Sequence, residues 1–405
     1  MLINQTYFID SCDDVELNIK RESKLEYRIT YDDSKEMKAI VFIIGGFGDN
    51  ANISFLDFDR EYLVKNFNVV VVDVFYHCFS ARPSIDENYN PIFKPNKKDW
   101  ESFCEIANLC NLQILEHEKD NFKACLEKLN EKVEVIKDEG RLEKDFLVNL
   151  SCDFVLPNNE YQNYGIMAAI DHINALKDIM IKFPQFQNLP KIYGGGSYGG
   201  HLALMCAKIA PWYVDAVVDN SGVSLPHLPH LLGRETGCAE FFIKGKHYIL
   251  SCFVQKYWTR DENSLYYLSD DNYMIRVLLN SKHLKLQSEK NKNTIFVSYH
   301  SAKDDGAPVE HKTNLYEIYN QLGFDATLHI VKDEADIDGR YIKSLEHGLR
   351  MTNRALFKKE LPILLEKFQG KKFDMKEDSI SYPCKDKIFT FKDIKDKFVL
   401  EITQF

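Results

Sequence analysis

The chain opens with three short stretches in which apolar and polar residues alternate, at residues 7–9, 15–19 and 25–29. Alternation is typical of strands with one buried face, so we expect antiparallel edge strands here. Two continuous apolar runs follow, at residues 39–44 and 69–73. Such runs are typical of strands that are buried on both faces. A helix is expected between them, over residues 55–66, which gives the strand–helix–strand order of a parallel sheet.

Strands and helices continue to alternate after residue 160. Strands are expected at residues 191–195, 214–218, 294–298 and 326–331. Helices are expected at residues 161–183, 202–210, 309–322 and 345–369. This order predicts an α/β protein with a mostly parallel central sheet that is flanked by helices.

Two regions interrupt the alternation, at about residues 80–160 and 223–290. In the first, apolar residues recur every three or four positions over residues 122–136, which indicates an amphipathic helix. We interpret both regions as helical insertions that cap the sheet. We expect residues 1–370 to form one α/β domain with these insertions, and residues 371–405 to form a short β-rich extension.

Composition and charge exclude several classes of partner. The formal net charge is −10, which is unfavourable for binding a phosphate backbone, so no nucleic-acid partner is expected. No apolar run approaches the roughly 18 residues that a membrane-spanning helix needs. The first residues carry Asp10, Asp13 and Asp14 and lack the basic start and apolar core of a signal peptide.

The cysteines indicate a reducing compartment. The chain has ten of them, none in a Cys-x-x-Cys pair, and several stand in apolar surroundings, as Cys206 does. Free buried thiols are typical of proteins that are kept reduced. The cytoplasm is therefore the expected location.

The segment that carries chemistry is Gly-Gly-Ser-Tyr-Gly-Gly at residues 195–200, which contains the spacing Gly-x-Ser-x-Gly. It stands between an expected strand and an expected helix, the context that a nucleophile elbow requires. Gly195 and Gly199 would let neighbouring backbone approach where a side chain would clash. Ser197 is therefore the expected nucleophile. A glycine-rich turn that binds phosphate or only packs tightly is the alternative.

A serine nucleophile needs a base, and the base needs an acid that orients it. On this kind of sheet the chain order is Ser, then Asp or Glu, then His. His347 is the only histidine after the strand expected at residues 326–331, and it is the expected base. Asp304 follows the strand at residues 294–298 and is the preferred acid. Asp305 and Asp219 remain alternatives.

Two N–H groups are needed for the oxyanion of an acyl-transfer reaction. The residue after the nucleophile, Tyr198, should supply one of them. The glycine-rich loop at residues 45–49 follows a buried strand, and Phe47 is the candidate for the second donor. An ordinary turn is the alternative. The loop lacks the Gly-x-Gly-x-x-Gly spacing of a dinucleotide site.

No metal or cofactor is expected. His227 and His230 have His-x-x-His spacing, but two prolines interrupt the segment and no third ligand is apparent. Zinc usually needs three or four organised ligands. A Ser–His–Asp mechanism requires no cofactor.

These residues together resemble the α/β-hydrolase superfamily, in its prolyl-oligopeptidase-like and acyl-esterase branch. More closely, the chain is similar to a bacterial family of unknown function, DUF2920, over most of residues 35–370. The segments that carry the resemblance are residues 45–48, 164–174, 195–200, 300–304 and 346–348.

The resemblance implies roles for single residues. Ser197 matches the nucleophile, Asp304 the acid and His347 the base. Phe47 and Tyr198 match the oxyanion donors. The chain departs from the branch in two places. Two glycines stand where the oxyanion loop usually has His-Gly, and His-Ser-Ala-Lys-Asp stands where the acid loop usually has His-Gly-x-x-Asp.

The hypothesis is a cytoplasmic serine hydrolase that cleaves carboxylic esters through an acyl-enzyme. The branch implies a small acylated metabolite or an acetylated sugar as substrate. A serine peptidase, an acyltransferase and a non-catalytic binding protein of the same fold are the alternatives. The sequence leaves the oligomeric state open.

Overall fold

The computed structural model describes residues 1–46 and 53–405. Eight strands form its central sheet, in the spatial order β1–β2–β4–β3–β7–β8–β11–β12. Their bounds are Leu2–Asp10 (β1), Lys24–Asp32 (β2), Ile40–Ile44 (β3), Val70–Phe75 (β4), Lys191–Gly196 (β7), Ala216–Asn220 (β8), Ile295–Ser301 (β11) and Asp325–Val331 (β12). β2 pairs antiparallel with β1 and with β4, and the remaining pairs are parallel. This order in a mostly parallel sheet is that of the α/β-hydrolase fold, which confirms the predicted fold class.

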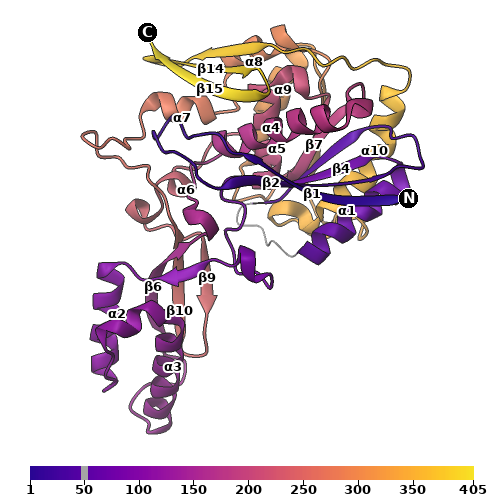
Figure 1. Cartoon of the computed structure of the whole chain (residues 1–405). Helices are drawn as coiled ribbons and strands as arrows, with labels where there is room; N and C mark the ends of the chain where they lie inside the picture. The colour runs from indigo at the N-terminus through magenta and orange to yellow at the C-terminus, as the bar shows by residue number, and fades with distance from the viewer. Residues whose placement is uncertain (47–52) are drawn as a thin grey trace.

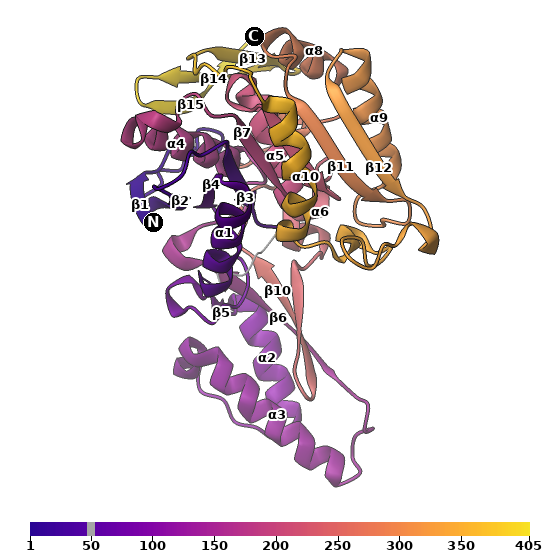
Figure 2. The ribbon, with the colours of Figure 1, turned by 90° about the vertical axis from the view of Figure 1, so that its right-hand side faces the viewer.

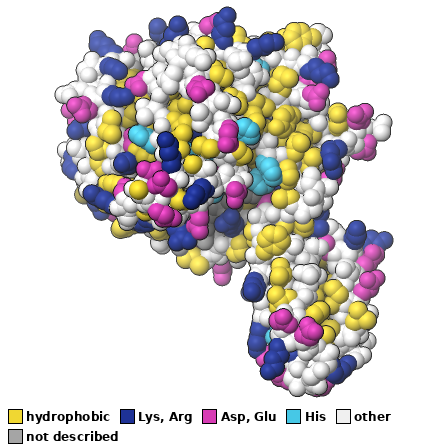
Figure 3. Space-filling model, turned by 180° about the vertical axis from the view of Figure 1, so that it is seen from behind, with side chains coloured by type: hydrophobic (Ala, Val, Ile, Leu, Met, Phe, Trp, Pro, Cys, Tyr) yellow, Lys and Arg dark blue, Asp and Glu magenta, His cyan; other side chains and the backbone are white. Residues whose placement is uncertain are grey.

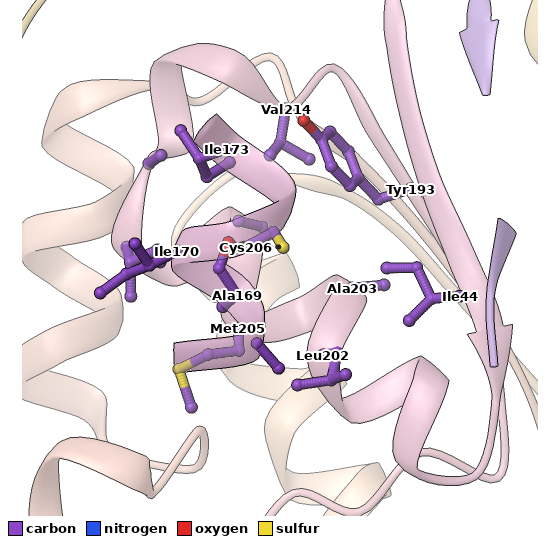
Figure 4. Close-up of a cluster of buried hydrophobic side chains, with 14 of the residues drawn as sticks. Ile44, Ala169, Ile170, Ile173, Tyr193, Leu202, Ala203, Met205, Cys206 and Val214 are labelled. Atoms are coloured by element: carbon purple, nitrogen blue, oxygen red, sulfur yellow. Dashed lines mark hydrogen bonds between the residues drawn. The ribbon is translucent and has the colours of Figure 1, made fainter. Parts of the chain in front are cut away.

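Helices cover both faces of the sheet (Figure 2). Their bounds are Ile53–Phe67 (α1), Ile166–Lys182 (α4), Tyr198–Ile209 (α5), Val309–Gln321 (α9) and Asn353–Phe368 (α10). Side chains of β3 alternate between the two faces, because successive residues of a strand point in opposite directions. Phe42 packs in the core that includes α4, α5 and α9, and Val41 packs in the core that includes α1 and α10. Figure 4 shows part of the first core, which includes Ile173 of α4, Cys206 of α5 and Tyr193 of β7.

The two insertions form an arm that projects from the body (Figure 1). Its sheet has the order β5–β6–β10–β9, with bounds Ile92–Lys94, Val148–Val155, Tyr248–Val254 and Phe241–Lys244 in that order. The first insertion supplies α2 (Lys97–Leu109) and α3 (Phe122–Asp138), which share a separate apolar core with this sheet. The insertions are therefore not only helical, because β6 of the first pairs in parallel with β10 of the second.

The rest of the second insertion and the C-terminal residues pack on the body. The second insertion also forms α6 (Leu228–Leu232), α7 (Asp270–Arg276) and α8 (Ser281–Lys290). The last residues form a three-stranded sheet of β13 (Ser379–Pro383), β14 (Lys387–Ile394) and β15 (Lys397–Gln404). The Asn174 amide of α4 donates to the Phe398 carbonyl at 2.9 Å and accepts from its N–H at 2.8 Å, which ties β15 to the body. No helix in the described residues has the length and apolar character needed to cross a membrane.

The strand expected at residues 15–19 does not form. Asp14 and Ile19 make only an isolated bridge around a turn. The Asp14 carboxylate accepts from the N–H groups of Glu16 and Leu17 at 3.0 and 3.1 Å. A side chain that bonds to nearby backbone in this way favours a turn over a strand.

The apolar face of α4 should matter more to stability than its outer face. Ile173 is fully buried, and its truncation in Ile173→Ala should lower the free energy of unfolding by about 2–5 kcal/mol. Ile181 lies on the same helix with 58% of its surface exposed, so Ile181→Ala should cost less than about 0.5 kcal/mol. Urea unfolding followed by circular dichroism measures both values. Equal losses would contradict the packing described here.

Candidate active site

Ser197 lies at the turn between β7 and α5, with φ 55° and ψ −120°. These angles are strained for a residue with a side chain. Glycines on both sides make the turn feasible. A Cβ atom on Gly195 would lie 2.1 Å from the Ile44 carbonyl oxygen, and one on Gly199 would lie 2.2 Å from the same atom. Only glycine fits at these two positions, so the sequence dictates a sharp turn with the serine at its tip.

His347 stands between Ser197 and Asp304. Its Nε2 lies 2.7 Å from the Ser197 Oγ, and its Nδ1 lies 2.8 and 2.9 Å from the two carboxylate oxygens of Asp304. An ionised carboxylate only accepts hydrogen bonds, so Nδ1 carries the proton and donates it. In the neutral ring Nε2 is then the acceptor, and the Ser197 hydroxyl donates to it. The structure thus brings together the three residues that the sequence singled out as nucleophile, base and acid.

Asp304 is buried and ionised. Its Oδ1 also accepts from the N–H groups of Gly306 at 3.0 Å and Ala307 at 2.8 Å. Burial by itself raises the pKa of this carboxyl. The hydrogen bonds from His347 and from the Ala307 N–H outweigh burial and hold the pKa below its ordinary 3.8. The group therefore carries a negative charge at neutral pH, next to the ring that it orients.

Within the part of the chain that the structure describes, neither alternative acid, Asp219 or Asp305, contacts His347. Asp219 is fully buried and accepts from the Lys312 ammonium at 3.1 and 3.2 Å, as well as from the Gly222 N–H at 2.9 Å. Asp305 follows Asp304 with its side chain exposed.

The chain around His347 is not the continuous helix that we expected from residue 345. Residues His347–Arg350 form a short 3-10 turn, and α10 begins only at Asn353. Gly348, Leu349 and Arg350 all have positive φ, at 76°, 53° and 48°. The apolar spacing of residues 345–369 continues the helical pattern across this break, so the spacing alone does not reveal it. The break turns His347 toward Ser197.

Three side chains that the sequence analysis did not single out hold this segment. The Asn220 amide donates to the Gly348 carbonyl at 2.7 Å. The Ser221 hydroxyl accepts from the Gly348 N–H at 3.0 Å, and the Ser301 hydroxyl donates to the Leu345 carbonyl at 2.6 Å. All three stand at the carboxyl ends of β8 and β11, where polar residues of a parallel sheet gather. That position was the only signal in the sequence.

The expected oxyanion donors are only partly described. Tyr198 is the first residue of α5, and N–H groups of a first helical turn point toward the helix start, where they attract negative charge. Phe47 lies outside the described residues. The loop that leads to it begins at Gly45, whose carbonyl accepts from the Tyr76 hydroxyl at 3.1 Å.

A mostly apolar cavity of about 620 Å³ lies beside the Asp304 loop. Its walls come from residues 222–230, after β8, and from the residues that follow Asp304, together with Tyr273 and His311. It shares Gly306 with an open hollow of about 640 Å³ that includes His347. In the view of Figure 3, histidine side chains lie among apolar ones on the body above the arm. A larger hollow of about 730 Å³ lies near the C-terminal ends of α1 and α10. Neither it nor the 620 Å³ cavity is lined by Ser197, Asp304 or His347, but the 620 Å³ cavity adjoins the hollow that includes His347.

His227 and His230 lie close together, with ring centroids 4.9 Å apart. Within residues 1–46 and 53–405, no three side chains of His, Cys, Asp or Glu come together in a way that could hold a metal ion.

Solved structures with a similar fold are distant in sequence. The acylaminoacyl peptidase of Pyrococcus horikoshii is 13% identical, with a TM-score of 0.47 over 93% of this chain and 43% of the peptidase. A ferulic acid esterase is 11% identical, with a TM-score of 0.43 over 90% of this chain and 98% of the esterase. An esterase of Thermogutta terrifontis is 12% identical, with a TM-score of 0.39 over 89% and 95% of the two chains. The chain thus spans less than half the length of the peptidase. A comparison with curated proteins finds no match.

A family comparison covers almost the whole chain. The model of DUF2920, described as a protein of unknown function, matches residues 5–402. The match takes in the central sheet with its elbow, the arm and most of the C-terminal sheet. The chain therefore belongs to the DUF2920 family.

Proposed function

We propose that this protein is a serine hydrolase that cleaves carboxylic esters. The observation that carries the proposal is the hydrogen-bonded line from the Ser197 Oγ through His347 to the Asp304 carboxylate, with links of 2.7 and 2.8 Å. A serine, a histidine and a carboxylate in this order form the arrangement that activates a hydroxyl for attack on an acyl carbon. The strained turn at Ser197 supports the same reading.

In the proposed reaction, the Ser197 Oγ attacks the ester carbonyl carbon while His347 Nε2 takes the hydroxyl proton. Asp304 stabilises the imidazolium that forms. The tetrahedral oxyanion accepts from the Tyr198 N–H and, we propose, from the Phe47 N–H. When the intermediate collapses, the C–O bond to the alcohol breaks and His347 returns its proton to the leaving alcohol. Water then attacks the acyl-enzyme with His347 as base, and this releases the acid and restores Ser197.

The cavity beside the Asp304 loop favours an uncharged apolar group on the substrate. Burial lowers the pKa of His230 to about 4 and also lowers that of His227, so both rings are neutral at pH 7. Lys312 lines the cavity, but its ammonium is paired with Asp219. Asp305 also lines it, with its side chain exposed to water. Small acyl esters fit such walls better than charged ones, because an unpaired charge loses its hydration in an apolar site. All ten cysteines are free, which fits the proposed cytoplasmic location.

The primary test removes the nucleophile. Ser197→Ala should lower the turnover of p-nitrophenyl acetate by about 10⁴-fold or more, because Ser–His–Asp residues act as a unit. Labelling by a fluorophosphonate probe should disappear with it. Ser288→Ala removes a hydroxyl from α8 and should leave both signals unchanged. A folded natural protein that neither turns over the ester nor labels would refute the proposal and leave a binding role on this fold.

The two neighbouring aspartates separate the acid from its alternative. Asp304→Asn should lower kcat by about 10⁴-fold, because an amide no longer favours the required histidine tautomer. Asp305→Asn should stay within about threefold of the natural protein, as expected for a surface change. Steady-state kinetics at pH 7.5 measure both variants. If kcat fell strongly in Asp305→Asn and little in Asp304→Asn, the acid would be Asp305.

The lowered pKa of Asp304 gives a prediction on pH. A carboxylate whose folded pKa lies below its unfolded value stabilises the fold above the unfolded pKa and loses this effect as pH falls through the folded one. The stability that the ionised group contributes should therefore be complete above about pH 4 and should fall below pH 3.8. The gap in unfolding free energy between the natural protein and Asp304→Asn, measured by urea unfolding from pH 7 to pH 3, should stay constant and then narrow. A gap that narrows near pH 6 would contradict the assignment.

The cavity predicts a preference for longer acyl chains. One buried methylene contributes about 0.8 kcal/mol, so kcat/KM should rise roughly fourfold per carbon from acetyl to butyryl esters. Leu225 lines the cavity, and Leu225→Trp should abolish this rise while acetyl turnover changes little. Leu265 is 94% exposed, and Leu265→Trp is the matched control. A chain-length profile that Leu225→Trp leaves unchanged would place the acyl group elsewhere.

A further inference from the structure

The carbonyl oxygen of Ile44 lies where the end of β3 meets the turn of Ser197 between β7 and α5. β3 ends at Ile44, which pairs with Gly195 of β7. The same oxygen is the atom that a Cβ on Gly195 or Gly199 would strike, at 2.1 and 2.2 Å. Gly45 and Gly46 follow directly and begin the loop proposed to carry the second oxyanion donor. The position of Ile44 therefore bears directly on the turn that carries Ser197.

One side-chain amide joins these two parts. The Asn353 Oδ1 accepts from the Gly196 N–H at 3.0 Å, and its Nδ2 donates to the Ile44 carbonyl at 3.3 Å. Gly196 comes directly before the nucleophile, and Ile44 directly before the oxyanion loop. The amide thus bridges β3 and β7 at the point where their pairing ends.

The chemistry of the bridge selects an amide. It must accept from one backbone group and donate to another, and only Asn and Gln offer both with a planar side-chain amide. Gln is one methylene longer. An aspartate would keep the acceptor and lose the donor, and its charge would face the Ile44 carbonyl oxygen.

The bridge also involves the base segment. Asn353 is the first residue of α10, three residues after the short turn His347–Arg350. The helix that anchors the amide is therefore the same one that follows the base. Asn353 thus links the chain segment of His347 to the turn of Ser197.

We propose that Asn353 is a positioning residue that holds the nucleophile turn, with Ser197 and the Tyr198 N–H, against the end of β3. The inference rests on the proposed function. Asn353 acts through the backbone of Gly196 and Ile44. An oxyanion donor stabilises charge that develops only in the transition state, so a displaced donor lowers kcat and leaves KM nearly unchanged. A loss of overall stability would not produce this split.

The test compares two variants at Asn353 with a matched asparagine elsewhere. In Asn353→Ala, kcat for p-nitrophenyl acetate should fall by about 10- to 100-fold, the scale expected for a misplacement of up to 1 Å, with KM within twofold. Asn353→Asp keeps one of the two bonds and should fall between Asn353→Ala and the natural protein. The control is Asn291→Ala, which removes a similar tie from Nδ2 to the Pro211 carbonyl at 2.9 Å, away from Ser197. Asn291→Ala should lower the melting temperature about as much as Asn353→Ala does, but it should keep the kcat of the natural protein.

A second readout does not depend on turnover. Hydrogen–deuterium exchange of peptides that span residues 192–197 should be faster in Asn353→Ala than in Asn291→Ala, because the Gly196 N–H loses its acceptor. In Asn353→Asp, which keeps that acceptor, the exchange should stay near the natural rate. If the natural protein turns over the ester and Asn353→Ala keeps the same kcat, the positioning role of Asn353 is overturned and the proposed function still stands. A natural protein without ester turnover would overturn the proposed function, and unchanged exchange at residues 192–197 in Asn353→Ala would then overturn the positioning role as well.

Discussion

The carboxyl edge of the sheet depends on how closely β3 approaches the turn after β7. The Ile44 carbonyl fills the space that a side chain at Gly195 or Gly199 would need, at distances no Cβ can adopt. This contact holds the backbone of Ser197 at φ 55° and ψ −120°, and the hydroxyl then leaves the sheet toward His347. Backbone strain of this kind costs roughly 1–3 kcal/mol and persists only where the surroundings fix it. Here β3 and β7 fix it, because both are buried on both faces.

Two buried carboxylates at the same sheet edge, Asp219 and Asp304, have different charged or hydrogen-bonding partners. Both Asp219 and Asp304 are buried, and a buried carboxylate needs partners to stay ionised. Asp219 receives the Lys312 ammonium, which neutralises it within the core. Asp304 receives backbone N–H groups and the ring of His347. Asp304 is thus the carboxylate that faces His347, because Asp219 is held by a lysine of α9, a contact between residues 93 positions apart in the chain.

The arm couples segments that are far apart in sequence. Its central pair, β6 and β10, is parallel, so the chain must cross over between them. That crossover passes through α4, β7, α5 and β8 of the body, including the elbow. The arm has its own apolar core. Its sheet is complete only once β10, which follows the crossover through the body, pairs with β6. The crossover between these two strands of the arm therefore carries the turn of Ser197, whereas Asp304 and His347 follow β10 in the chain.

The sequence determined the features that depend on local chemistry. Apolar runs predicted β3 and β4, and the glycine pattern around Ser197 predicted the elbow, because both signals lie within a few neighbouring residues. It failed where short-range patterns compete. Residues 15–19 alternate as a strand would, but they form a turn because the Asp14 carboxylate binds nearby N–H groups. Residues 345–369 keep the apolar spacing of one helix, although the helix is interrupted at His347–Arg350. Only the tertiary structure decided which carboxylate faces His347, that Asn220 and Ser221 hold its segment, and that the Asn353 amide joins Ile44 to Gly196. The physical reason is that these contacts join strand ends and loops across 43 to 309 positions of the chain, and a hydrogen bond at that separation leaves no periodic trace in the sequence.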